Sequence, residues 1–169
     1  MEKQYSAAYW KEQLNLETHV EGGAFKEMYR SETVLPQSVL SNEHKGDRNT
    51  STSIYFLLEY GEFSAFHRIA SDELWHFYDG AGLTVYEIEE SGTLVIHKLG
   101  KDVASGEFPQ AVIKAGSWFA SRVEHEGGYA LCGCTVAPGF DFADFELADR
   151  NKLSESYPEH SSLIAELTH

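Results

Sequence analysis

A series of short apolar segments, each bounded by turn residues, fills the chain from residue 53 to residue 137 and constrains its fold most. The breaks between them fall at glycines such as Gly61, Gly92 and Gly106 and at the pair Gly127-Gly128. Many short strands separated by glycine turns are typical of an antiparallel β-sandwich or β-barrel. The predicted strands are 53–60, 63–69, 73–78, 83–89, 93–99, 111–114, 117–122 and 129–137.

The segment before this region carries a helical pattern, then a strand and a loop. Residues 5–16 predict an amphipathic helix, because Ala7, Trp10 and Leu14 recur at spacings of three and four residues. Ser6 can cap its first turn. The pattern then predicts a strand at 24–31 and an irregular polar loop at 36–50.

The segment after the strand region is predicted to be helical. Asp149 can cap one short helix, and Pro158 suits the first position of another that runs to residue 167. No repeat, low-complexity stretch or Pro/Gly linker interrupts the sequence. We therefore predict a single domain over residues 1–169, with a helix at about 6–16, a barrel at about 24–145 and C-terminal helices at about 149–168.

The composition narrows the classes of partner. Lys and Arg number 13 and Asp and Glu 27, so the formal net charge is −14, and this surface would repel a nucleic acid. No apolar run approaches the roughly 20 residues that cross a bilayer, and residues 1–5 are polar, without the apolar core of a signal peptide. We expect a cytoplasmic protein that binds neither nucleic acid nor membrane.

The cysteines agree with that expectation. Cys132 and Cys134 are the only two, and they lie one residue apart in a predicted strand. Their side chains point to the same face but are offset along it, which is awkward for a direct disulfide. We predict buried free thiols, and two cysteines alone cannot complete a structural zinc site.

The segment from residue 61 to residue 80 carries the most chemistry. His67 and Glu73 flank a predicted turn at 70–72 between two strands, so both side chains can face one interior. There they could share a proton, a metal ion or a substrate hydroxyl, and they are the predicted catalytic pair. Glu73, Trp75 and Phe77 share one face of their strand, whereas His76 lies on the other face unless a bulge intervenes.

The spacing of Gly61, His67, Glu73 and Gly80 resembles the first motif of the cupin superfamily. That resemblance implies a mostly β fold, a double-stranded β-helix or jelly-roll barrel with a pocket at its centre. Here the barrel would carry the N-terminal helix and the short C-terminal helices as additions.

Cupin metal sites usually take two His and one Glu from the first motif and a third His from a second motif. In this sequence Ile69 stands at the second His position, and the second motif aligns on 114–119, which places Phe119 at the last one. One His and one carboxylate are a poor cage for a transition metal. We therefore predict no metal and no cofactor, although His76 or His125 could supply an unusual ligand.

A resemblance that covers most of the chain is carried by residues 19–31, 51–58, 66–68, 72–76, 116–120 and 136–142. These segments resemble the uncharacterised cupin proteins called cupin family five. The resemblance implies a fold similar to the deoxysugar 3,5-epimerases, commonly as a homodimer, and no established reaction. In those epimerases the N-terminal strand lies near the pocket, which makes Phe25, Glu27 and Tyr29 candidate pocket or dimer residues.

Further residues are candidates for ligand binding, but ion pairing or core packing would explain them equally well. Arg30, Arg48 and Arg122 are three of five arginines, and they either converge to bind a phosphate or carboxylate or pair with surface acids. Strand alternation points Arg68 away from His67, so it is a ligand-binding candidate or an ion-pair residue. The aromatic residues that either line the pocket or pack the core are Tyr55, Trp75, Phe77, Trp118 and Phe119.

Three functions fit these features. The first is a metal-independent isomerase or epimerase-like enzyme, in which His67 removes a proton next to a carbonyl of a sugar-like metabolite, Glu73 orients it, and a Tyr or Arg stabilises the enolate. The second is a module that binds a small molecule without chemistry. The third is a metal cupin with altered ligands.

Overall fold

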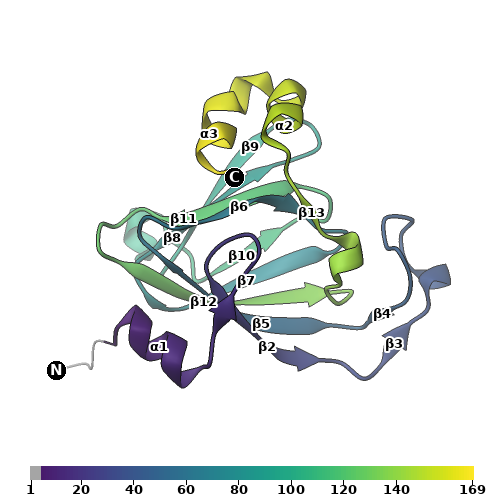
Figure 1. The fold of residues 1–169 in the computed structure, drawn as a ribbon, viewed down its shortest axis with the longest axis horizontal. Coiled ribbons are helices and arrows are strands. Elements are labelled where there is room, and N and C mark those ends of the chain that lie inside the picture. The colour runs from purple at the N-terminus through teal and green to yellow at the C-terminus, as the bar shows by residue number, and fades with distance from the viewer. Residues whose placement is uncertain (1–4) are drawn as a thin grey trace.

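Two antiparallel sheets face each other in the computed structural model, which describes residues 5–169 (Figure 1). The predicted domain and its polar N-terminus include residues 1–4, which lie outside the described residues. The first sheet has the order β1 (Glu17–Thr18), β2 (Ala24–Arg30), β5 (Thr52–Glu59), β12 (Tyr129–Ala137), β7 (Asp72–Gly80) and β10 (Gln110–Ile113). The second has the order β13 (Glu146–Leu147), β6 (Phe63–Arg68), β11 (Trp118–Val123), β8 (Leu83–Ile88) and β9 (Leu94–Leu99).

Neighbouring strands in this arrangement are mostly distant in sequence, which is the jelly-roll arrangement that the cupin resemblance implies. Each strand predicted between residues 53 and 137 is present. The strand predicted to include Ile69 ends at Arg68, because the chain there leaves the second sheet and enters the first at Asp72. The loop predicted at 36–50 contains a single turn of 3-10 helix, Gln37–Val39, and β4 (Arg48–Asn49), which pairs with β3 (Val34–Leu35).

The helices cover the outer faces of the sheets. Helix α1 (Ala7–Gln13) is capped as predicted, because the Ser6 hydroxyl accepts a hydrogen bond from the Tyr9 amide at 3.1 Å. Ala7 of this helix is buried with Leu57 and Leu131 on the outer face of the first sheet.

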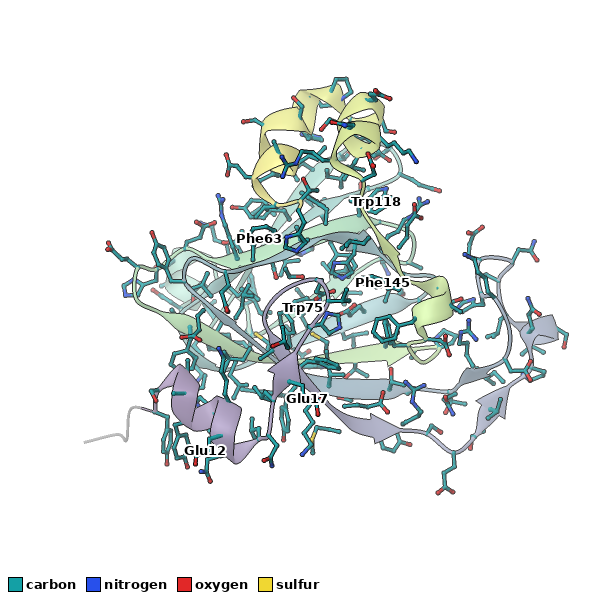
Figure 2. The ribbon with its side chains drawn as sticks, viewed as in Figure 1. Glu12, Glu17, Phe63, Trp75, Trp118 and Phe145 are labelled. Atoms are coloured by element: carbon teal, nitrogen blue, oxygen red, sulfur yellow. The ribbon has the colours of Figure 1, made fainter. Side chains whose placement is uncertain are left out.

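The C-terminal helices lie over the second sheet (Figure 1). Helix α2 (Arg150–Ser156) is capped by Asp149 as predicted, and Pro158 begins the turn Pro158–His160 that leads into α3 (Ser161–Glu166). Leu153 and Ile164 are buried there with Trp118, which lies beneath α2 and α3 in Figure 2.

The main core lies between the sheets, where Trp75, Phe56 and Phe119 are each about 1% exposed. Cys132 and Cys134 are free and buried in it, as predicted. Among residues 5–169, no helix is long and apolar enough to cross a membrane.

Candidate functional site

A cavity of about 240 Å³ opens between the sheets, where β2, β5 and β12 meet the segment that follows β12. The walls bring together ionisable and aromatic side chains from segments that are far apart in sequence. Its lining residues are His19, Glu21, Phe25, Glu27, Arg30, Thr52, Ile54, His67, Ile69, Glu73, Cys134, Val136, Phe140, Asp141 and Phe142. We call this cavity the central pocket.

His67 lies in the wall of the central pocket, and both of its ring nitrogens have partners. Its Nε2 lies 3.0 Å from Glu21 Oε2, and its Nδ1 donates to the carbonyl oxygen of Ala65 at 2.7 Å. Burial lowers the pKa of His67, but the Glu21 carboxylate and these hydrogen bonds outweigh it and raise the pKa above the usual 6.5. His67 is therefore the positive half of a buried ion pair.

Glu21 is the negative half of this pair, and it is 6% exposed. Burial raises its pKa, but the charge and hydrogen bond of His67 outweigh burial and bring the pKa below 4.5. The Ser64 hydroxyl donates a further hydrogen bond to Glu21 Oε1 at 2.9 Å. The carboxylate is therefore held ionised by partners of its own chain.

The local backbone places Glu21 in this position. The Ala65 amide donates to the Glu21 carbonyl at 2.8 Å, which fixes the segment against β6. Gly22 adopts φ +114°, and a Cβ there would lie 2.1 Å from the Phe63 carbonyl oxygen, so only glycine fits. The adjacent glycines Gly22-Gly23 thus let this segment lie close against the chain's own strands.

Glu73 enters the central pocket from the opposite sheet and has a different environment. It is 8% exposed, and burial raises its pKa from 4.5 to about 7, although the charge of His67 acts in the other direction. The neighbouring Cys134 thiol also lowers the pKa of Glu73, but less than burial raises it. His67 and Glu73 do face one interior as predicted, but the direct partner of His67 is Glu21.

Arg30 and Glu27 lie together at the pocket wall. Arg30 donates to the Glu27 carboxylate through Nε at 3.0 Å and through a terminal nitrogen at 2.7 Å. Its other terminal nitrogen donates to Asn49 Oδ1 at 2.9 Å and to the Phe140 carbonyl at 3.0 Å. Of the three arginines considered together, Arg30 alone lines the pocket, and Arg122 pairs with Glu124 and Glu166 elsewhere.

Several candidate ligand residues lie on the outside of the first sheet. Tyr29 is 55% exposed, and Tyr55 packs its ring against Tyr78 at 6.1 Å. His76 lies on the outer face, as strand alternation from Glu73 requires, and lines a shallow hollow there. Its Nε2 forms a hydrogen bond with Thr135 Oγ1 at 3.2 Å. These side chains do not line the central pocket.

Other candidates pack the molecule around the pocket. Trp75 lies in the core, and Trp118 lies in the cluster under α2 and α3. Phe119 packs against the His67 ring at 4.1 Å without lining the pocket. The aromatic candidates other than Phe25 therefore pack the interior or the outer face instead of forming the pocket wall.

The remaining arginine candidates are held by carboxylates. Arg48 is 5% exposed and donates to both oxygens of Asp144 at 2.6 Å, which fastens the 36–49 loop beside the pocket. Arg68 is exposed, pairs with Glu146 at 2.7 Å and lies over the Trp118 ring. Neither guanidinium reaches the central pocket.

The cupin resemblance implies a metal site, and the residues of the pocket do not fit one. Ile69 lines the pocket with an apolar side chain, and Phe119 is the strand partner of His67 in the sheet. Within residues 5–169, no three His, Cys, Asp or Glu residues are grouped to hold a metal ion. The proposed substitutes do not help, because His76 lies on the outer face and His125 is exposed in a turn.

No role was predicted from the sequence for Glu21, for Asp141 or for the aromatic residues of the segment after β12. Glu21 and Asp141 lie within the segments 19–31 and 136–142 that carry the family resemblance, but the sequence assigns them no role. The sequence does carry one indication of Glu21, because this residue directly precedes Gly22-Gly23. A glycine pair lets the backbone lie close to a neighbouring strand, which can bring the preceding side chain into the interior. Contacts between segments so far apart in sequence cannot be read from spacing alone.

Comparisons with known proteins agree with this architecture. The family described as "Cupin superfamily (DUF985)" matches residues 8–148. A protein from Shewanella oneidensis, known from its X-ray crystal structure, is 40% identical and covers 98% of this chain and 99% of its own, with a TM-score of 0.87. A hypothetical protein from Leishmania major is 32% identical over 98% of this chain and 99% of its own, with a TM-score of 0.89.

A more distant likeness extends to the fold alone. A cupin 2 domain-containing protein from Halorhodospira halophila is 11% identical and covers 86% of this chain and 85% of its own, with a TM-score of 0.54. Among curated proteins, none matches this chain.

Proposed function

This chain belongs to the cupin superfamily family DUF985, and we propose that its central pocket is the active site of a metal-independent, isomerase- or epimerase-like enzyme. The substrate would be a small carbonyl or sugar-like metabolite. The proposal rests on side chains of the chain itself, because the pocket does not offer the ligand set of a metal cupin.

The observation that carries the proposal is the buried carboxyl of Glu73. Its pKa of about 7 means that acid and carboxylate forms coexist near neutral pH, which suits a group that must accept a proton and return it. In this proposal Glu73 takes over the role of base that the sequence analysis gave to His67. The reason is that both ring nitrogens of His67 are already engaged.

The proposed step is a proton transfer. The Glu73 carboxylate takes a proton from the carbon next to the substrate carbonyl. The C–H electron pair forms a C=C bond, the π pair of the carbonyl moves onto its oxygen, and an enolate results. The positive charge of His67 lies close enough to act on Glu73 and favours its ionised form. If the proton on Glu73 first exchanges with solvent, its return to the same face of the carbon completes an exchange. Delivery of a proton from solvent to the opposite face gives the epimer.

Solvent hydrogen exchange tests this function directly. Wild-type protein and Glu73→Gln are incubated in D₂O with a panel of small ketones, aldehydes and ketoses, and deuterium on carbon is followed by NMR. Wild type is expected to label at least one compound and Glu73→Gln to label none. The exposed variant Glu126→Gln serves as the matched control and should label like wild type. Labelling by Glu73→Gln at the wild-type rate would refute the assignment.

A second candidate is a binding module without turnover, and the engaged nitrogens of His67 favour it. A side chain whose two donors are already used cannot shuttle a proton unless it first leaves a partner. Native mass spectrometry of gently purified protein separates the two functions. A retained compound that stays unchanged over hours supports binding alone, whereas a converted compound supports the enzyme.

The assembly and location of the protein stay predictions. We expect a homodimer with a small-molecule ligand, as the resemblance to the deoxysugar 3,5-epimerases implies, and a cytoplasmic location. Light scattering on the purified protein tests the dimer, and a mass of one chain would contradict it.

A further inference from the structure

The charges that line the central pocket are unequally compensated. Four carboxylates line it, and two of them are neutralised within the chain. Glu21 is paired with His67, and Glu27 is paired with Arg30. Glu73 and Asp141 are left, and neither forms an ion pair within the described part of the chain.

The cationic groups of the pocket are committed to these pairs. Arg30 directs its paired Nε and terminal nitrogen at Glu27, and its remaining terminal nitrogen at Asn49 and the Phe140 carbonyl. In this arrangement it offers no free fork to a phosphate or carboxylate ligand. His19 adds no charge near neutral pH, because burial lowers its pKa more than Glu21 raises it. An anionic ligand would meet carboxylates without a free partner.

Glu73 and Asp141 differ in how they are held. Glu73 is 8% exposed, and burial of an unpaired carboxylate is unfavourable unless a ligand offsets it. Asp141 caps the short turn Phe142–Asp144 by accepting from the Ala143 amide at 2.8 Å. Its charge is felt by Arg30 and Arg48, but each of these guanidinium groups is ion-paired with another carboxylate, Glu27 or Asp144. Both carboxyl groups belong to the wall of the same cavity.

Aromatic rings complete the wall. Phe25, Phe140 and Phe142 line the pocket, and Phe142 is 58% exposed although it is a large apolar side chain. Phe140 and Phe142 meet edge to face, with ring centroids 5.0 Å apart. Phe145, labelled in Figure 2, packs behind them at 5.7 Å from Phe142 and stacks on His67 at 5.4 Å. Aromatic rings beside carboxylates attract organic cations.

We propose that the central pocket selects a small organic cation, a metabolite that carries an alkylammonium or quaternary ammonium group, and excludes phosphorylated and nucleotide-linked compounds. This inference rests on the proposed function because it concerns the same pocket, and it adds the chemical class of the substrate. Asp141 supplies the charge, and Phe140 and Phe142 supply the ring contacts. At about 240 Å³, the cavity is smaller than the roughly 300 Å³ at which pockets for drug-sized ligands begin, so the cation must be small.

A set of matched probes tests the charge preference. Choline, its neutral carbon isostere 3,3-dimethylbutan-1-ol and the anion 3,3-dimethylbutanoate share a similar apolar body and differ in charge. Each is titrated into the full chain to about 10 mM, and binding is followed by NMR. At that concentration a site with a dissociation constant of about 1 mM is nearly saturated. Choline is expected to bind about 10-fold more tightly than the neutral isostere, and the anion to bind least.

Two charge-matched variants give the control. Asp141→Asn keeps a cap oxygen for the Ala143 amide and should weaken choline binding several-fold. Asp102→Asn removes the same charge from another cap of a short turn, outside the pocket, and should bind choline like wild type. Phe142→Leu should weaken choline binding and leave binding of the neutral isostere within about two-fold.

Each other outcome overturns the inference. Equal binding of choline and the isostere, tighter binding of the anion, equal effects of the two Asp variants, or no binding of any probe would each contradict a cation site. The proposed function is judged separately by deuterium exchange. Choline binding without exchange on any carbonyl compound would refute the enzyme alone, and exchange on an anionic compound would refute the cation preference alone.

Discussion

Wild type is expected to lose stability relative to the Glu73→Gln variant as the pH rises. The pKa of Glu73 is about 7 in the folded chain against an ordinary 4.5, so the folded state binds a proton more tightly than the unfolded state. The stability that this proton supplies is fully present below pH 4.5 and is lost as the pH rises through 7. Glutamine fills the same space without ionising.

The magnitude follows from that difference in pKa. At about 1.4 kcal/mol for each pH unit, the whole effect on the free energy of unfolding is about 3 kcal/mol. Between pH 5.5 and pH 8.5, wild type should lose about 2 kcal/mol relative to Glu73→Gln. The lower pH is kept above the isoelectric point of about 4.9, because a protein without net charge tends to aggregate.

Chemical denaturation at the two pH values measures this difference. Any loss of packing caused by glutamine itself is present at both pH values and cancels. Because about 1 kcal/mol shifts the Tm of a chain of this size by roughly 2–4 °C, thermal melting should show a relative shift of about 4–8 °C. The exposed variant Glu126→Gln should show no such change between the two pH values. If the difference in the free energy of unfolding between wild type and Glu73→Gln is the same at both pH values, Glu73 is not a buried carboxyl group that binds a proton near neutral pH.

Three further substitutions test other contacts. His67→Ala is expected to lower the free energy of unfolding by about 3 kcal/mol, because Glu21 stays buried without its partner, and adding Glu21→Ala should restore part of the loss in denaturant titrations. A single variant as stable as wild type would contradict the ion pair. Arg48→Lys should destabilise by about 2 kcal/mol in thermal melting, because an ammonium cannot bind both oxygens of Asp144 as a guanidinium does, and an unchanged Tm would disprove this. Arg68→Ala should change stability by less than about 1 kcal/mol and leave choline binding intact, whereas lost binding would place Arg68 in the site.

Most of the fold could be predicted from the sequence, because local chemistry determines it. Glycine turns delimit the strands between residues 53 and 137, and Ser6 and Asp149 cap helices where the pattern predicts. The exceptions depend on tertiary contacts. Strand β4 forms because Arg48 pairs with Leu35 across the small sheet and with Asp144 from the far end of the chain.

The candidate site was predicted only in part. Strand alternation placed Glu73 inward and His76 outward, and the structure agrees with both. The partner of His67 could not be found in this way, because Glu21 reaches it from a loop more than forty residues earlier, where no periodic pattern exists. The aromatic candidates were ambiguous for a similar reason, since a ring in a strand serves the core and a pocket wall equally well.

Direct titration of the Glu73 side chain shows whether the pocket holds a carboxyl group able to exchange a proton near neutral pH. Protein labelled with ¹³C at the glutamate carboxyl carbons is followed by NMR from pH 5 to pH 9, and the Glu73 signal is assigned by its absence in Glu73→Gln. We expect a midpoint at about 7. A midpoint near the ordinary 4.5 would contradict this expectation and would leave the central pocket without the acid–base group on which the proposed function depends.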